Sequence, residues 1–413
     1  MEEEPLKGPL NSLFSWRILS RQNVRAILIG LFSLFHAFSW GSTDIRVRLF
    51  SSQKLQRIEI KAYEGEFVLM ALRGEEVVDT VCDLFAADHS IEIKRQSNKL
   101  NVYERGLGLG SFDRLQVWFS DSLDIQQLLV KDKERIYRGK LDVWSSGGEL
   151  LVINEVELEE YVAGVVESEG GHILSLPYFK AQAVLARTFA VKNWNKHSSY
   201  GYNLKDDVTS QVYHHMAYLR HSDQIRLAVQ QTRDSILLDN ECEPILAAFH
   251  ANSGGQTANS EDAWLSEISY LRSRPDPHSL EGPSAKWEKR ISQREFLNYL
   301  AKKFNTAPDD ILLRKAILNL PREERLADIV YKERRVRLKD VRKAFKLRSA
   351  YFSVKEDGND FILLGRGFGH GVGMSQDGAM VMAGKGFDYK DILYFYFSRV
   401  ELDQLRFYPH LVD

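Results

Sequence analysis

The segment Leu158-Glu-Glu-Tyr-Val-Ala-Gly-Val-Val-Glu-Ser-Glu169 has the apolar spacing of a helix that buries one side. Its apolar residues follow an i, i+3, i+4, i+7, i+8 pattern and are Leu158, Tyr161, Val162, Val165 and Val166. Glu169 stands three residues after Val166 and therefore continues the same face. The spacing predicts an amphipathic helix that ends with a carboxyl on its apolar side.

The predicted position of Glu169 has a chemical consequence. A carboxyl held against an apolar surface loses solvation, which raises its pKa and keeps it protonated nearer neutral pH. A carboxyl that is protonated at neutral pH is what a general acid needs. The alternative is that Glu169 lies beyond the helix end and is solvated, which leaves it an ordinary surface carboxylate.

A second helix is expected over residues 179–192, because Ser175-Leu-Pro177 supplies a capping residue and a proline for the first turn. Three polar side chains of this helix stand beside small residues: Lys180, Gln182 and Arg187. Such side chains either form a solvated face or contact a ligand at close range. Between the two helices, Gly170-Gly171 permits a tight turn where the backbone could approach a substrate.

Several segments in a fixed order resemble the SpoIID/LytB family, which contains stage II sporulation protein D and amidase-enhancer proteins. The core of the resemblance runs from Val152-Ile-Asn154 to Arg187-Thr-Phe-Ala-Val191 and includes Ser168-Glu169. Three later segments also match: Thr209-Ser-Gln211-Val-Tyr213, Phe249-His-Ala-Asn-Ser253-Gly-Gly255 with its continuation to Trp264, and the loop from Gly365 to Ala379. The resemblance covers about residues 137–397, with one divergent stretch near residues 290–350.

The resemblance implies an α+β fold, with a SpoIID-like catalytic domain in which helices pack on β-structure. It also implies lytic transglycosylation of peptidoglycan, with the glutamate of the Ser-Glu pair, here Glu169, as the essential acid. We expect further residues of the matched motifs to bind the glycan: Ser168, Lys180, Gln182, Arg187, Gln211, Tyr213, Ser253, Gly254, Gly255, His370 and Gln376. The family often has Met-Pro after the glutamate where this chain has Gly170-Gly171, which predicts a wider local loop.

A lytic transglycosylase needs only one carboxyl group. The sugar's own C6 hydroxyl is the nucleophile, and its intramolecular attack has a high effective concentration. Protonated Glu169 would cleave between N-acetylmuramic acid and N-acetylglucosamine, and the family prefers strands from which amidases have removed the stem peptides. A hydrolytic muramidase would need a second carboxylate, such as Glu261 or Asp262. A further alternative is a non-catalytic wall-binding protein that enhances an amidase.

Two glycine-containing segments are candidates for the glycan groove. Ser253-Gly254-Gly255 follows an apolar run at residues 245–249 that predicts a buried strand, and its amides would point at sugar hydroxyls. The alternative is an ordinary polar turn. The loop that begins at Gly365 has neither the Gly-x-Gly-x-x-Gly spacing nor a Gly-Lys-Ser/Thr phosphate loop, which argues against nucleotide binding. His370 in this loop is a candidate for substrate contact, although a lone histidine is more often structural.

We expect no cofactor and no metal. Some family members resemble zinc proteins, but the positions of their Cys, His and Cys ligands hold Lys205, Thr209 and Ser210 here. A tetrahedral zinc site needs thiolate or imidazole ligands. His214 and His215 follow closely, but adjacent residues rarely converge on one ion without further ligands.

The N-terminus predicts export. Basic residues precede an apolar run at residues 26–40, which is shorter than the ~20 residues that span a bilayer. A cleaved signal peptide over residues 1–41 is favoured over a retained anchor, and the protein is then expected in the periplasm or cell-wall space. The net charge of −2 gives no reason to expect a nucleic-acid partner. Cys82 and Cys242 could form at most one disulfide.

At 413 residues the chain is long enough for two domains. Residues 42–148 are expected to form a β-rich accessory domain that packs on the catalytic part or binds the cell wall. Short alternating segments predict strands at residues 45–50, 57–62, 66–71, 90–94 and 115–119. The catalytic domain then spans residues 149–413, with a charged helical insertion at about residues 290–347.

Overall fold

The computed structural model describes residues 43–85, 90–119, 125–130, 133–170, 175–217, 221–264 and 266–412. The chain divides into one unit that ends at Thr43 and one compact unit, Asp44–Asp413. The predicted signal peptide lies outside the described residues. Within the described residues, no helix combines the length and apolar character needed to cross a membrane.

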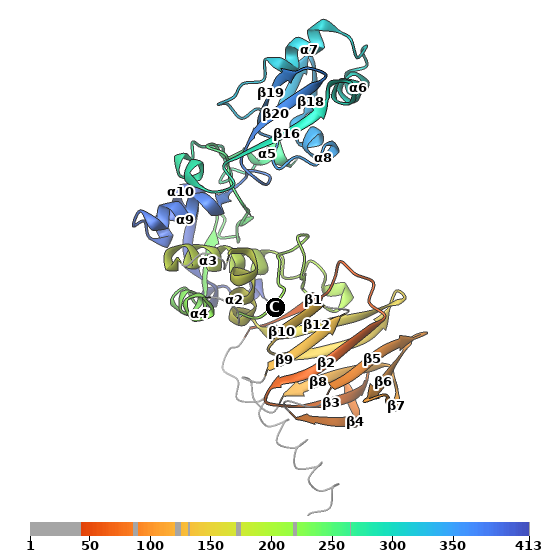
Figure 1. Ribbon diagram of the computed structural model, residues 1–413. Coiled ribbons are helices and arrows are strands. Elements are labelled where there is room, and N and C mark those ends of the chain that lie inside the picture. Colours follow the sequence, from red (N-terminus) through yellow and green to blue (C-terminus); the bar gives the residue numbers. More distant parts are fainter. Residues whose placement is uncertain are drawn as a thin grey trace, which may run out of the picture. The chain divides into compact units, whose positions relative to one another are not determined.

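The region before residue 158 is built from strands that form two antiparallel sheets (Figure 1). Its strands are β1 (Asp44–Leu49), β2 (Arg57–Glu64), β3 (Glu66–Arg73), β4 (Glu76–Phe85), β5 (Ser90–Gln96), β6 (Lys99–Glu104), β7 (Leu107–Phe112), β8 (Arg114–Phe119), β9 (Ile125–Val130), β10 (Lys133–Tyr137), β11 (Lys140–Ser146) and β12 (Glu149–Glu157). The six-stranded sheet has the order β10-β9-β2-β5-β6-β7. The seven-stranded sheet has the order β13-β1-β12-β11-β8-β3-β4, in which β13 (Leu204–Lys205) comes from a later part of the chain.

Alternation of side chains gives each sheet one apolar face. In β1, Ile45, Val47 and Leu49 are buried, whereas the intervening side chains are more exposed. Apolar residues of both sheets belong to one hydrophobic core. The five predicted strands are confirmed, and the other strands of this region were not predicted. Several of these, such as β7 with its Gly108 and Gly110, lack a clear apolar alternation.

Strand β12 joins the β-rich region to the segment that carries Glu169. It pairs with β1 on one side and with β11 on the other, so it lies inside the seven-stranded sheet. The predicted boundary at residue 148 falls in the turn between β11 and β12, two strands of the same sheet. Helix α2 (Leu158–Gly170) begins directly after β12, so the sheet fixes where this helix starts.

Helices and short strands form the next part of the chain. They are α3 (Leu176–Lys192), α4 (Ser222–Gln231), β14 (Ser235–Leu238), β15 (Phe249–His250), α5 (Ser260–Ala263), β21 (Met374–Ser375), α9 (Gln376–Gly384), α10 (Tyr389–Tyr396) and β22 (Glu401–Gln404). Both predicted helices are confirmed as α2 and α3, and the α+β class is confirmed. The strand predicted at residues 245–249 is wrong in extent, because the chain turns where Ala248 N–H donates to the Leu246 carbonyl, and only β15 pairs, with β21.

The segment between β15 and β21 contains a separate hydrophobic core. Its elements are β16 (Lys286–Ser292), α6 (Gln293–Phe304), α7 (Ile311–Leu318), β17 (Asp328–Tyr331), β18 (Arg334–Arg337), α8 (Leu338–Ala344), β19 (Phe352–Asp357) and β20 (Asp360–Arg366). Helical residues such as Phe296, Leu300 and Phe304 supply much of this core, as their spacing indicates. The strands β16, β20 and β19 form a sheet beneath them, which the helical character of the sequence did not predict.

Candidate active site

Glu169 lies in the last turn of α2, with its carboxyl partly buried. Its Oε1 accepts a hydrogen bond of 3.0 Å from the backbone N–H of Val212. Burial raises the pKa of Glu169, and the hydrogen bond from Val212 opposes this effect without cancelling it. The desolvation that the apolar spacing of α2 predicts is therefore present.

Two tyrosines are electrostatically coupled to Glu169. Burial is the main reason why the pKa values of Tyr161 and Tyr178 are raised, and the negative charge of Glu169 adds to the effect at both. Both side chains are fully buried. Gln376, at the start of α9, donates from its Nε2 to the backbone carbonyl of Glu169 over 3.3 Å. Glu169 thus stands where α2, α3 and α9 meet.

Gly170 is required by the close approach of Tyr178. A Cβ atom at Gly170 would overlap the hydroxyl and ring carbons of Tyr178. The ring of Tyr178 thus fills the space beside Gly170, and the loop that was expected to be wider lies outside the described residues from residue 171 to residue 174. Gly171 lies outside the described residues.

The segment that follows α3 holds the other side of Glu169. Ser168 Oγ accepts a 3.2 Å hydrogen bond from the N–H of His214, two residues after Val212. Gln211 is almost fully buried, and its Oε1 accepts a hydrogen bond from the Tyr161 hydroxyl. Tyr213 is fully buried and donates to Asn154 over 2.9 Å. Both side chains are enclosed on either side of Val212, and their contact with the glycan stays a prediction.

Three residues of α3 that are predicted to contact the glycan lie in different environments. Arg187 is fully buried and forms a two-pronged ion pair with Glu159 of α2, with 2.9 Å between Arg187 Nε and Glu159 Oε1. The structure therefore gives Arg187 an internal partner, and its contact with a glycan stays a prediction. Gln182 is also fully buried, and its amide has no hydrogen-bond partner among the described residues, so its glycan contact stays a prediction as well. Lys180 is partly exposed beside the ring of Tyr389 and stays a candidate.

The Ser253-Gly254-Gly255 turn is an internal structural element. Ser253 is fully buried, and its Oγ donates to Asp276 and contacts the Ser279 hydroxyl, at 2.7 Å each. The amides of Gly254 and Gly255 donate to Asn252 Oδ1 and Ser279 Oγ. The protein itself thus supplies acceptors for both amides, and the expected contact with sugar hydroxyls stays a prediction. Both glycines have positive φ, and a Cβ at Gly254 would overlap the backbone at Arg366.

His370 lies beside the insertion. Its ring contacts the rings of His250 and Trp264, and its Nδ1 accepts a 3.0 Å hydrogen bond from the N–H of Val372. With Arg325 and Arg342 it lines a small cavity of about 60 Å³. Burial, together with the charges of these two arginines, lowers the pKa of His370 to about 4, so the ring is neutral at pH 7. No hydrogen bond joins His370 to Glu169 within the described part of the chain, so His370 stays a candidate for binding.

Glu261 is poorly suited to be the second carboxylate that a hydrolase would need. Both of its oxygens accept hydrogen bonds from Arg272, each at 2.9 Å. Burial acts to raise the pKa of Glu261, but the hydrogen bonds from Arg272 outweigh it and the pKa is lowered. A carboxylate held in this way is a poor proton acceptor.

Comparison with known proteins supports the family resemblance. A sequence profile described as "Stage II sporulation protein" matches residues 146–238, which include α2, α3 and Glu169. Stage II sporulation protein D of Bacillus subtilis is 33% identical over 265 residues, which cover 61% of this chain and 76% of that protein. The chain belongs to the SpoIID/LytB family. An uncharacterised protein of Brachyspira hyodysenteriae is 30% identical over 64% of this chain and 72% of its own length. The amidase enhancer of B. subtilis is 24% identical and is covered over 40% of its length.

The family's zinc positions carry other contacts in this SpoIID/LytB member. Ser210 Oγ accepts from the N–H of Lys205, and Thr209 donates to Asp207 from both its N–H and its hydroxyl. In the described part of the chain, no three His, Cys, Asp or Glu side chains come together as a metal site would require. Cys82 and Cys242 are not joined to each other by a disulfide.

Some organising residues of this family member escaped the sequence analysis. Asp276 and Asp377 hold the Asn252-Ser253 turn, and Tyr178 closes the site behind Gly170. Asp276 stands in a segment without a helical or alternating pattern, and Asp377 stands in the first turn of α9 beside several glycines, so the sequence carries no clear signal for their burial. The glycine after Glu169 was a usable signal, because Gly at a helix end predicts a close neighbour.

Proposed function

We propose that this protein is an exported peptidoglycan lytic transglycosylase with Glu169 as its general acid and base. The observation that carries the proposal is the desolvated carboxyl of the Ser168-Glu169 pair, at the end of α2 in a SpoIID/LytB family member. The bond to be cleaved joins N-acetylmuramic acid to N-acetylglucosamine. The products carry 1,6-anhydro ends.

The raised pKa of Glu169 supplies the first step. Protonated Glu169 donates to the glycosidic oxygen while the bond to the anomeric carbon breaks. Oε1 already accepts from Val212, and Oε2 has no hydrogen-bond partner among the described residues, which makes Oε2 the oxygen that carries the proton. The Val212 N–H then stabilises the carboxylate that remains.

The same carboxylate completes the reaction. It accepts the proton of the C6 hydroxyl as that oxygen bonds to the anomeric carbon, which returns Glu169 to its acid form. Because the nucleophile belongs to the sugar, no second carboxylate and no ordered water are required. This chemistry agrees with the engagement of Glu261 by Arg272, which makes Glu261 a poor base for activating water.

The proposed substrate is a glycan strand from which stem peptides have been removed, as the resemblance to the SpoIID/LytB family implies. Export places the protein in the periplasm or cell-wall space, where this substrate occurs. The second candidate function is that of a non-catalytic enhancer of a cell-wall amidase. It is supported by the similarity to a relative named amidase enhancer.

Mass spectrometry of products tests the proposal. The purified protein, its Glu169→Gln variant and a Glu167→Gln control are incubated with amidase-stripped and with intact peptidoglycan. Glu167 stands on the same helix two residues earlier, so its variant controls for the loss of one carboxyl from α2. We expect anhydromuramyl products from the protein and from Glu167→Gln, and none from Glu169→Gln.

Other products would identify the alternatives. Reducing ends would show a muramidase and direct attention to a second carboxylate. Absence of products on both substrates, with glycan binding retained, would contradict the lyase and favour the amidase enhancer.

A further inference from the structure

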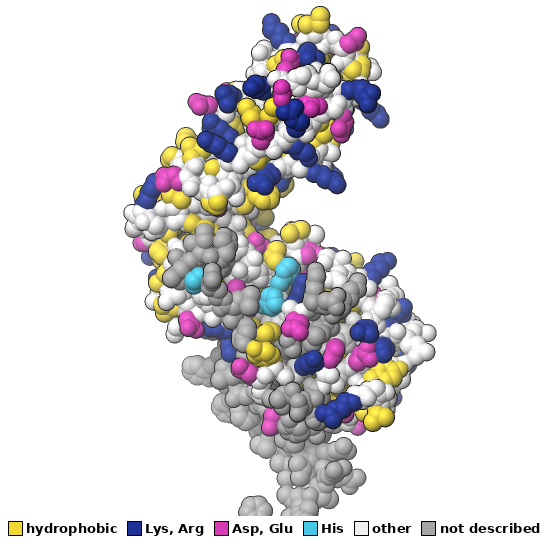
Figure 2. All heavy atoms as spheres, viewed as in Figure 1, with side chains coloured by type: hydrophobic (Ala, Val, Ile, Leu, Met, Phe, Trp, Pro, Cys, Tyr) yellow, Lys and Arg dark blue, Asp and Glu magenta, His cyan; other side chains and the backbone are white. Residues whose placement is uncertain are grey.

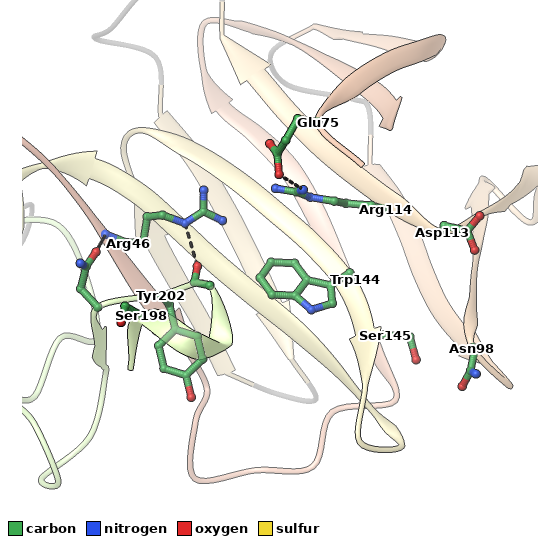
Figure 3. Close-up of a pocket in the computed structure, with 11 residues that line it drawn as sticks. Arg46, Glu75, Asn98, Asp113, Arg114, Trp144, Ser145, Ser198 and Tyr202 are labelled. Atoms are coloured by element: carbon green, nitrogen blue, oxygen red, sulfur yellow. Dashed lines mark hydrogen bonds and ion pairs between the residues drawn. The ribbon is translucent and has the colours of Figure 1, made fainter. Parts of the chain in front are cut away.

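The polar face of the seven-stranded sheet contains a second, larger hollow, of about 660 Å³ (Figure 3). Strands β1, β8 and β11 contribute Arg46, Arg114 and Trp144 to its floor. The turn at residues 198–203 forms one wall. This volume is within the ~300–1,000 Å³ typical of sites for small ligands or single sugar units. Neither Glu169 nor any residue that contacts it lines the hollow.

Trp144 provides an aromatic surface in this hollow. Figure 3 shows its indole between the turn at residues 198–203 and Arg114. Gly201 lies against one edge of the ring, where a Cβ would be 3.7 Å away, and Arg114 is 5.7 Å from the ring centre. The indole N–H has no acceptor among the described residues. An indole face is electron-rich, so it attracts the weakly positive C–H groups on the flat side of a pyranose ring.

The two arginines are already neutralised by the protein. Arg46 contacts Asp142 and Glu155 at 2.9 Å each and donates from Nε to the Gly201 carbonyl. Arg114 pairs with the same Asp142 and with Glu75, the latter at 2.6 Å. Asp142 is almost fully buried, so these pairs hold both guanidinium groups in place. A rigid floor without surplus positive charge disfavours an anionic ligand.

Uncharged groups remain for a ligand. The exposed Asn98 amide has no hydrogen-bond partner among the described residues. The Ser198 hydroxyl donates to Asn195 but keeps its acceptor sites. An aromatic face surrounded by neutral donors and acceptors matches a ligand that is itself neutral, ring-shaped and rich in hydroxyl and amide groups.

We propose that this hollow is a second binding site for the neutral N-acetylglucosamine units of a glycan strand, with Trp144 as the stacking surface. The proposal rests on the proposed function only for the source of the ligand, the cell-wall glycan. It gives the β-rich region the task of holding a strand while another part of it is cleaved.

The chain links this hollow directly to the candidate active site. Asn203 in its wall binds the backbone N–H of Arg46, and β13 follows at once and pairs with β1. Nine residues after Asn203 stands Val212, whose N–H binds Glu169. Nine residues span at most ~32 Å, so the hollow and the acid are within reach of one glycan strand.

Binding of N-acetylchitotetraose and of amidase-stripped glycan strands tests the site. All measurements use full-length protein that carries Glu169→Gln, so that cleavage does not consume the ligand. We compare this protein with a Trp144→Ala variant and with Trp118→Ala as a matched control. Trp118 stands on the same face of β8 as Arg114 but does not line the hollow. We expect Trp144→Ala to weaken binding roughly tenfold and Trp118→Ala to leave it unchanged.

A second variant guards against misfolding of Trp144→Ala. Trp144→Phe keeps an aromatic ring on the floor of the hollow, and we expect it to retain more binding than Trp144→Ala. Circular dichroism and the urea midpoint verify that each variant is folded. Because N-acetylchitotetraose is neutral, we expect its binding to change less than about twofold between about 50 and 500 mM NaCl.

The outcomes separate this proposal from the proposed function. Equal binding by the parent and by folded Trp144→Ala overturns the site, whether or not the parent protein forms anhydromuramyl products. Trp144-dependent binding supports the site even if the parent protein forms no such products, in which case only the lyase is refuted. Binding of strands that needs the stem peptides, or binding of N-acetylchitotetraose that falls steeply with salt, contradicts a neutral sugar ligand.

Discussion

Replacing Arg187 by methionine tests whether Arg187 acts inside the protein through its ion pair with Glu159. The change removes one partner of an ion pair in which the Arg187 side chain is fully buried and the Glu159 side chain is 11% exposed. Loss of one partner leaves an uncompensated charge and typically costs about 3–5 kcal/mol. We expect a value near 3 kcal/mol, because Glu159 keeps some contact with water. The hydrogen bond from Arg187 to the Ser235 carbonyl is lost as well and adds about 1 kcal/mol.

The assay is urea unfolding at pH 7 of four proteins: the parent, Arg187→Met, Glu159→Met and the double variant. Because the double variant leaves no unpaired charge, we expect it to recover at least 2 kcal/mol relative to the sum of the single changes. Glycan binding by folded Arg187→Met should equal that of the parent. Parent-like stability together with lost glycan binding would refute the structural role of Arg187 and support its predicted contact with the glycan.

Four further results are expected. Since burial raises the pKa of Glu169, the acid form should persist above the ordinary value of about 4.3, and an alkaline limb of the pH–rate profile at that ordinary value would contradict burial. Because the pKa of Glu169 is higher in the folded state, protonated Glu169 favours folding in acid, and this contribution to stability is lost as the pH rises through the raised pKa. Glu169→Gln should therefore be more stable than the parent at pH 7 but not at pH 4. Gly170→Ala should destabilise the protein by about 1–3 kcal/mol because its Cβ overlaps Tyr178, despite the ~1 kcal/mol gain of alanine in a helix. Adding Tyr178→Phe should partly restore stability. An unchanged urea midpoint for Gly170→Ala would disprove the overlap. Nuclear magnetic resonance of the His370 ring should show no titration between pH 5 and 8, because its pKa is about 4.

Much of the fold follows from local patterns in the sequence. The helix spacing of α2 and the alternation of strands such as β1 reflect burial of one face, which is a local property. The position of β13 does not follow, because two residues after α3 pair with β1 more than 150 residues earlier. Nothing in Leu204-Lys205 itself specifies that partner. The strands of the insertion were not predicted for another reason: the charged residues in β16 and β18 suggested helix.

The candidate site was predictable in part. Glu169 was identified because an apolar face and a carboxyl coincide in one periodic segment. Polar residues inside the family motifs were assigned to the glycan because sequence alone does not show burial. In the structure, Arg187 pairs with Glu159 and Ser253 donates to Asp276. Such partners, Glu159 and Asp276, are distant in sequence, so only the folded chain reveals which polar groups are already occupied.

Figure 2 shows acidic and basic side chains intermingled over the described surface on the viewed side. This mixture agrees with a net charge of −2 for the whole chain. Within residues 290–347, however, Lys and Arg outnumber Asp and Glu. The charge of the insertion therefore differs in sign from that of the chain as a whole.

The central place of β12 limits how evolution can exchange parts of this protein. A strand with hydrogen-bonded neighbours on both sides leaves two rows of open backbone groups when it is transferred alone, and such edges promote aggregation. A gene fragment that begins at residue 149 would carry Glu169 together with an unprotected strand. The heritable module is therefore the sheet with its helix, and recombination that preserves function must keep β1, β11 and β12 together with α2.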